Sequence, residues 1–83
     1  MSEIPPHLRW ACRRGMLELD VLLGNFLEQS YVKLTLQEQE WFVKLLNCND
    51  QELFEWLTQK IIPTDPEIFV MVNKVREHAR SRH

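Results

Sequence analysis

Apolar residues at helical spacing set the strongest limit on how this chain can fold. From Leu19 onward they recur at intervals of three and four residues, at Leu22, Leu23, Phe26 and Leu27. This spacing places them on one face of a helix, which needs another element to cover it. The chain has 83 residues, enough for one domain with one modest core, and no segment alternates like a strand. The pattern predicts a single all-α domain over residues 1–83, a small bundle of about five helices.

Two prolines and a glycine bear on the first two predicted helices. Pro5 and Pro6 are tolerated only at the start of a helix, which predicts a short helix at about residues 7–14. A second helix should follow at about residues 16–29. Gly24 falls among its apolar positions, where we expect another helix to cross closely.

Capping signals predict three further helices after a connection or extended link at residues 30–34. Residues suited to a helix start precede each of them: Thr35 with Glu38, Asn49 or Asp50, and Asp65 with Pro66. Two prolines within residues 61–66 exclude a continuous helix there. We expect the second, third and fifth helices to form the packed centre, and the chain ends, including residues 81–83, to fray.

The run from Trp10 to Asp20 departs from what folding alone requires. Gly15 inside a helix would cost about 0.5–1 kcal/mol relative to alanine. It can end a short helix, open a turn between two helices, or let another backbone approach closely. Arg14 and Glu18 would lie side by side if one helix ran through them, but such an exposed pair gives only about 0.3–0.5 kcal/mol. Stability alone therefore explains this cluster poorly.

Charge and cysteine usage exclude several classes of protein. The formal net charge is −2, and acidic residues dominate between two basic ends. A general nucleic-acid binder would instead need an excess of cations to neutralise phosphates. Cys12 and Cys48 lack the spacing of metal ligands, so we expect free thiols in a reducing compartment and no metal site.

The sequence contains no grouping of residues typical of a catalytic site. The serines are not grouped with a histidine and an acid, and two glycines are too few for a phosphate-binding loop. Residues 1–6 do not resemble a secretory signal, and no apolar stretch approaches the ~20 residues that span a membrane. We therefore predict a cytoplasmic interaction protein that is not an enzyme.

Three kinds of interaction protein fit these observations. The first is a protein-binding assembly factor that docks through the Trp10–Asp20 run. The second is a DNA-binding regulator or antitoxin-like module, although Glu18, Asp20 and Glu28 on its recognition helix would face a polyanion. The third, an electron-transfer or small-cofactor protein, is the least favoured because no ligands for a redox centre are clustered.

The run Trp-Ala-Cys-Arg-Arg-Gly-Met-Leu-Glu-Leu-Asp at Trp10–Asp20 resembles the Arg-Gly-x-x-Glu signature of the SdhE (YgfY-type) family. Members of this family are small helical factors that assist covalent attachment of FAD to the flavoprotein subunits of succinate dehydrogenase and fumarate reductase. The resemblance covers nearly the whole chain, including its length, the apolar runs at residues 42–46 and 53–57, and the helical tail.

The resemblance implies a partner and a contact surface. This chain would bind the flavoprotein subunit as a monomer and stabilise a conformation competent for flavinylation. The FAD and the histidine that it modifies would belong to the partner, with no cofactor bound stably here. Arg14, Gly15 and Glu18 would be the contact residues, and a supporting group on the same surface would be Trp10, Arg9, Arg13 and Asp20.

Overall fold

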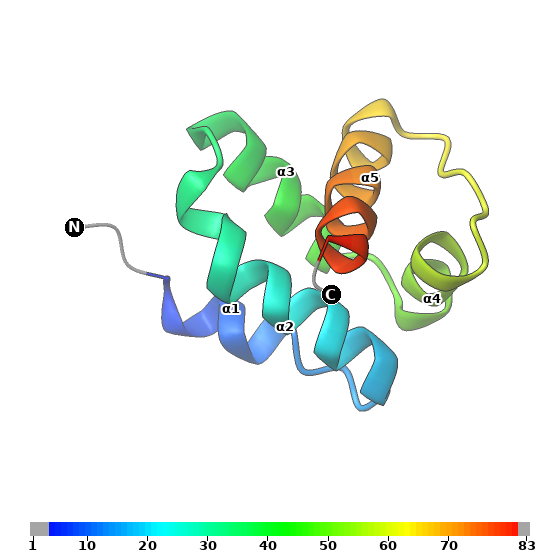
Figure 1. Cartoon of the computed structure of the whole chain (residues 1–83), viewed down its shortest axis with the longest axis horizontal. Coiled ribbons are helices and arrows are strands. Elements are labelled where there is room, and N and C mark those ends of the chain that lie inside the picture. Colours follow the sequence, from blue (N-terminus) through cyan, green and yellow to red (C-terminus); the bar gives the residue numbers. More distant parts are fainter. Residues whose placement is uncertain (1–3, 82–83) are drawn as a thin grey trace.

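A computed structural model describes residues 4–81 of the chain. Within these residues five α-helices and one short 3-10 helix follow one another, and no strand occurs (Figure 1). The elements are α1 (Pro6–Ala11), α2 (Leu17–Ser30), η1 (Tyr31–Lys33), α3 (Leu36–Leu46), α4 (Asp50–Thr58) and α5 (Pro66–Arg80). The predicted all-α fold is confirmed. The fraying expected at the chain ends concerns mainly residues 1–3, 82 and 83, which lie outside the described part.

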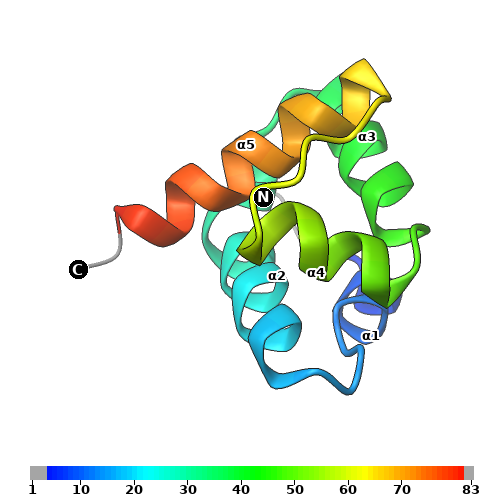
Figure 2. The ribbon, with the colours of Figure 1, turned by 90° about the vertical axis from the view of Figure 1, so that its right-hand side faces the viewer.

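Helix α5 organises the core. It packs against α2, α3 and α4, while α1 packs against α2. Phe42 of α3 is fully buried, and its ring centroid lies 5.4 Å from that of Phe26 on α2. The predicted centre of second, third and fifth helices is therefore confirmed. The last turns of α5 extend beyond the other helices (Figure 2).

The predicted helix starts are also confirmed. Thr35 and Glu38 form a complete capping box, with both hydrogen bonds at 3.1 Å. Asn49 caps α4 by accepting from the backbone N–H of Glu52, and Asp65 caps α5 with Pro66 as its first residue. These caps satisfy N–H groups that have no partner within the helix.

Two segments differ from the prediction. Residues 31–33 connect α2 and α3 as a 3-10 helix, so of the two predicted forms, a connection or an extended link, the extended one is wrong. The Tyr31 ring is buried, with its centroid 6.0 Å from that of Phe42. The first helix ends at Ala11 and does not reach Arg14. No single helix runs through Arg14 and Glu18, so the condition for their side-by-side placement is not met.

Gly24 does not lie at a close helix crossing, so that prediction is also wrong. Apart from its two chain neighbours and the nearby backbone of α2, a Cβ atom added at this position would meet no heavy atom of residues 4–81 within 4 Å. The glycine lies in the middle of α2 with ordinary helical geometry. Separately, no helix among residues 4–81 is both long and apolar enough to cross a membrane.

We expect Gly24→Ala to stabilise the protein by about 0.5–1 kcal/mol, because alanine restricts the unfolded chain and fits the helix without a clash. Thermal and urea unfolding followed by circular dichroism at 222 nm measure the change. A loss of stability would show that a neighbour packs against the glycine after all.

Candidate functional site

Arg14 lies in the link between α1 and α2 and joins three helix ends. Its Nη1 donates to the carbonyl oxygens of Ala11 and Leu46, each at 2.8 Å, and its Nη2 donates to that of Cys48 at 2.6 Å. Its Nε pairs with Asp50 Oδ1 at 2.7 Å. Ala11 and Leu46 are the last residues of α1 and α3, where carbonyls lack partners within the helix. The guanidinium satisfies these groups and ties the link to the corner between α3 and α4.

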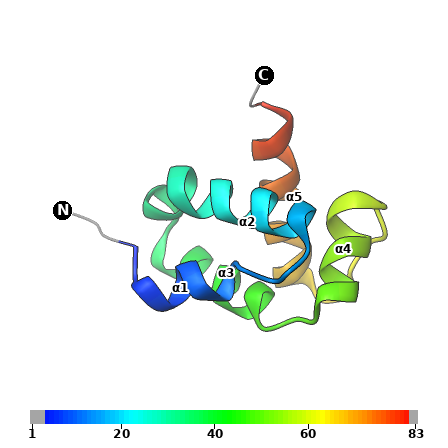
Figure 3. The ribbon, with the colours of Figure 1, turned by 90° about the horizontal axis from the view of Figure 1, so that it is seen from below.

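The views of the ribbon agree with these contacts. The C-terminal end of α1 lies beside that of α3, and the link then runs across to the start of α2 (Figure 3). The Arg14 side chain is only 14% exposed, so it faces the protein and not the solvent. This predicted contact residue therefore has a structural role in this chain.

The backbone of the link is fixed at two further points. The N–H of Arg14 donates to Asp20 Oδ1 at 2.6 Å. This hydrogen bond ties the link to the half-buried Asp20 on α2. Gly15 follows with φ +83°, a conformation that side chains rarely adopt. Apart from its two chain neighbours, no residue among 4–81 has a heavy atom within 4 Å of where its Cβ would be. Of its three possible uses, Gly15 serves the turn between two helices, and no backbone in the described part of the chain approaches it closely.

The remaining predicted site residues face outward around this turn. Gly15 and Glu18 are exposed, Glu18 on the first turn of α2. Trp10 is 72% exposed, and the Arg13 guanidinium lies 5.9 Å from the centroid of its ring. Arg9 is farther along α1 and forms an exposed ion pair with Glu28 of α2 at 2.6 Å. The structure thus separates outward residues, which a partner can reach, from Arg14 and Asp20, which hold the link.

Sequence reasoning missed three residues of this region. Leu17 and Val21 flank Glu18 on α2, and they are 77% and 47% exposed despite being apolar. Both fall outside the apolar stripe that begins at Leu19, which is the signal that could have identified them. The sequence pattern indicated Asp50 only as a helix cap, and its pairing with Arg14 spans 36 residues of sequence.

We call the outward group Trp10, Arg13, Gly15, Leu17, Glu18 and Val21 the motif face.

Both cysteines are free, as predicted. Burial raises the pKa of the Cys12 thiol to about 11, and burial also raises the pKa of Cys48. Both groups are therefore protonated at neutral pH and poorly nucleophilic. Among residues 4–81 no set of three or more histidine, cysteine or acidic side chains is arranged to hold a metal ion.

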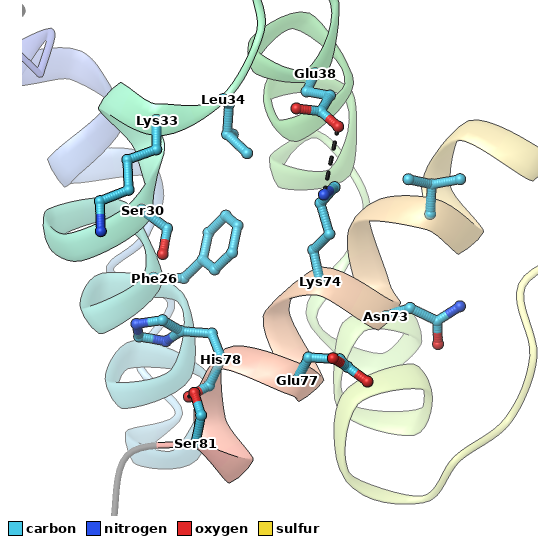
Figure 4. Close-up of a pocket in the computed structure, with 11 residues that line it drawn as sticks. Phe26, Ser30, Lys33, Leu34, Glu38, Asn73, Lys74, Glu77, His78 and Ser81 are labelled. Atoms are coloured by element: carbon cyan, nitrogen blue, oxygen red, sulfur yellow. Dashed lines mark hydrogen bonds and ion pairs between the residues drawn. The ribbon is translucent and has the colours of Figure 1, made fainter.

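Several grooves mark the surface of residues 4–81, and two of them bear on the site. The larger, of about 800 Å³, lies between the C-terminal half of α2 and that of α5 (Figure 4). In it Lys74 pairs with Glu38 at 3.4 Å, and Glu77 pairs with Arg80 at 3.3 Å, so these charged groups already have partners. The smaller, of about 440 Å³, is lined by Arg13, Val21 and Gly24 and adjoins the motif face. Because the smaller groove lies next to the Trp10–Asp20 run, we favour it as part of a contact surface.

We expect Arg14→Lys to destabilise the protein by about 2–3 kcal/mol, because lysine cannot serve four acceptors in a planar arrangement and leaves carbonyls without partners. The matched control is Arg13→Lys next to it, which should change stability by less than about 0.5 kcal/mol. Urea unfolding of both variants measures the difference. Equal stability of the two would contradict the structural role of Arg14.

We expect the Cys12 thiol in the folded protein to react with iodoacetamide about 100-fold more slowly at pH 8 than in urea, because its raised pKa reduces the thiolate fraction. The raised pKa also implies that Cys12 stabilises the fold below pH 9 and that this contribution is lost as pH rises toward about 11. Mass spectrometry of timed samples locates the label. Fast labelling of Cys12 under native conditions would contradict its burial.

Comparisons with known proteins place this chain in a family. Residues 6–79 match the family described as "Sdh5: Flavinator of succinate dehydrogenase". The chain is 47% identical over 72 residues to a protein of Shewanella oneidensis named "FAD assembly factor SdhE", covering 87% of this chain and 88% of that protein. It is 41% identical over 81 residues to the protein of that name from Aliivibrio fischeri, with 98% and 94% covered. These relatives are named as assembly factors and not as enzymes, in agreement with the prediction. The chain therefore belongs to the Sdh5 family of succinate dehydrogenase flavinators.

Proposed function

We propose that this chain binds the flavoprotein subunit of succinate dehydrogenase through the motif face and promotes its covalent attachment to FAD. The observation that carries the proposal is the outward placement of Glu18 beside Gly15 on a member of a flavinator family. Family membership favours this function over the alternative of a DNA-binding regulator. FAD and the residue that it modifies belong to the partner.

The motif face has the chemistry of a protein contact. Trp10 and Leu17 are among the most exposed apolar side chains of the described residues, and they border the charged Glu18 and Arg13. Aromatic residues and arginine are enriched among the residues that dominate binding energy, and charged groups fix the orientation of a complex. Gly15 adds no side chain at the turn, so a partner surface can come close to the backbone there.

The chain acts by binding one conformation of the flavoprotein more tightly than the others. A partner can shift a conformational equilibrium only by the ratio of its affinities for the two states. A hundredfold preference for the competent state, about 2.7 kcal/mol, would raise its population from about 1% to about half. No catalytic group is needed on this chain for such an effect.

Three narrower statements belong to the same proposal. The chain works as a monomer, because one motif face suffices for one flavoprotein. It also serves fumarate reductase, as the family resemblance implies. It binds no specific nucleic acid, because Glu18 is exposed on the first turn of α2 and would repel phosphates.

We expect Glu18→Ala and Gly15→Arg to lower covalent flavin on the succinate dehydrogenase flavoprotein at least about tenfold in a reaction of apo-flavoprotein, FAD and this chain. Glu18→Ala removes an exposed charge without touching the core, and Gly15→Arg adds bulk where the partner approaches. Flavin fluorescence of the denatured subunit on a gel measures the product.

The control for Gly15→Arg is Gly15→Asn, since asparagine adopts positive φ more readily than other residues and adds little bulk. It should retain most of the activity, with circular dichroism confirming that all variants are folded. Full flavinylation with both Glu18→Ala and Gly15→Arg would overturn the proposal. Equal losses with Gly15→Arg and Gly15→Asn would show that Gly15 acts through the turn alone.

A further inference from the structure

A residue outside the motif, Asp50, is paired with the arginine of the motif. The link of residues 12–16 has its Arg14 side chain inserted at the corner between α3 and α4, where Asp50 begins α4. In Figure 2 this corner lies beside α1 and the link. Asp50 is far from the motif in sequence but lies 2.7 Å from its arginine.

We propose that Asp50 is a positioning residue for the motif face: through Arg14 it sets the place of Gly15 and of the first turn of α2, and so controls affinity for the flavoprotein. This inference rests on the proposed function for the identity of the partner. Its structural half, that Asp50 sets the link, stands on the contacts of this chain alone.

The charge of Asp50 matters because of where the Arg14 guanidinium lies. Three backbone carbonyls orient the guanidinium, but each carries only a partial charge. The side chain is 14% exposed, so water screens its charge weakly, and the carboxylate of Asp50 supplies the balancing charge. Without that carboxylate the guanidinium gains by turning toward solvent, which would remove it from the carbonyls that it now joins.

Movement of Arg14 would reach the motif face through the backbone. The N–H of Arg14 is hydrogen-bonded to Asp20 on α2, and the next residue, Gly15, has the positive φ that reverses the chain. Glu18 follows on the first turn of α2. A rotation of Arg14 therefore changes the turn and the exposed positions on either side of it, while the buried stripe from Leu19 onward keeps α2 in place.

Asp50→Ala tests the inference, with Asp65→Ala as the matched control. Asp65 is also an aspartate at a helix start and also forms an ion pair, with Lys44 at 2.8 Å, but it does not contact the link. Both variants lose a helix-start acid and an ion pair, and Asp65→Ala also loses the cap of α5. A role limited to stability would therefore not spare Asp65→Ala.

Two measurements on the full chain separate the two halves of the inference. The first is the ¹H–¹⁵N NMR spectrum, in which Gly15 and Gly24 are the two glycine signals. The second is the Kd for the purified flavoprotein subunit of succinate dehydrogenase, by calorimetry. We expect Asp50→Ala to move the Gly15 signal and not that of Gly24, and to raise Kd about tenfold. Asp65→Ala should leave the Gly15 signal in place and Kd within about twofold.

Conservative variants complete the design. Asp50→Glu keeps the carboxylate and should restore Kd to within about threefold of the original protein, whereas Asp50→Asn keeps an oxygen acceptor without charge and should not. If Asp50→Ala fails to fold, Asp50→Asn replaces it in both measurements.

An unmoved Gly15 signal in the Asp50 variants, or an unchanged Kd, would overturn the inference, as would an equal loss of affinity with Asp65→Ala. If the original chain does not bind the flavoprotein, the proposed function fails, and with it the affinity half of the inference. The Gly15 signal then still decides whether Asp50 sets the link.

Discussion

The arrangement of this protein around its unusual sequence depends on one arginine, Arg14, whose side chain is only 14% exposed. No other side chain can replace the Arg14 guanidinium, because its donors lie in one plane and reach four acceptors at once. These acceptors are the carbonyls of Ala11, Leu46 and Cys48 and the carboxylate of Asp50. It connects the ends of α1 and α3 with the start of α4. A small domain has few residues with which to close such a junction by apolar packing, and one arginine joins four segments here.

The short first helix follows from this junction. The sequence pattern allowed a helix through residue 14, but a helical Arg14 would direct its side chain along α1 and leave the ends of α3 and α4 without it. Ending the helix at Ala11 frees the Arg14 backbone to donate to Asp20, and Gly15 then permits the reversal into α2. Local propensity for helix is thus overridden by hydrogen bonds that exist only once the domain is folded.

What the sequence could predict corresponds to signals that lie close together along the chain. Apolar spacing identified the core stripe from Leu19, and capping residues located the starts of α3, α4 and α5, because each depends on neighbours within one or two turns. The structural role of Arg14 could not be predicted from the sequence. Three of its four acceptors are backbone carbonyls, and every residue has one, so residue identity gives no signal. Gly24 gave a false signal. A glycine among apolar positions is typical of a close helix crossing, but Gly24 lines an open groove.

The Arg-Gly-x-x-Glu motif therefore combines two kinds of residue that sequence alone does not separate. Arg14 faces inward and builds the junction, Gly15 sets the turn, and Glu18 faces outward where a partner can reach it. A loss of function at Arg14 would consequently say little about contact, because the turn and the motif face depend on its placement. A loss at Glu18, whose side chain is exposed and lies off the core stripe, reports on contact much more directly. Exposure and hydrogen bonding, and not membership in the motif, decide which residue gives information about the partner.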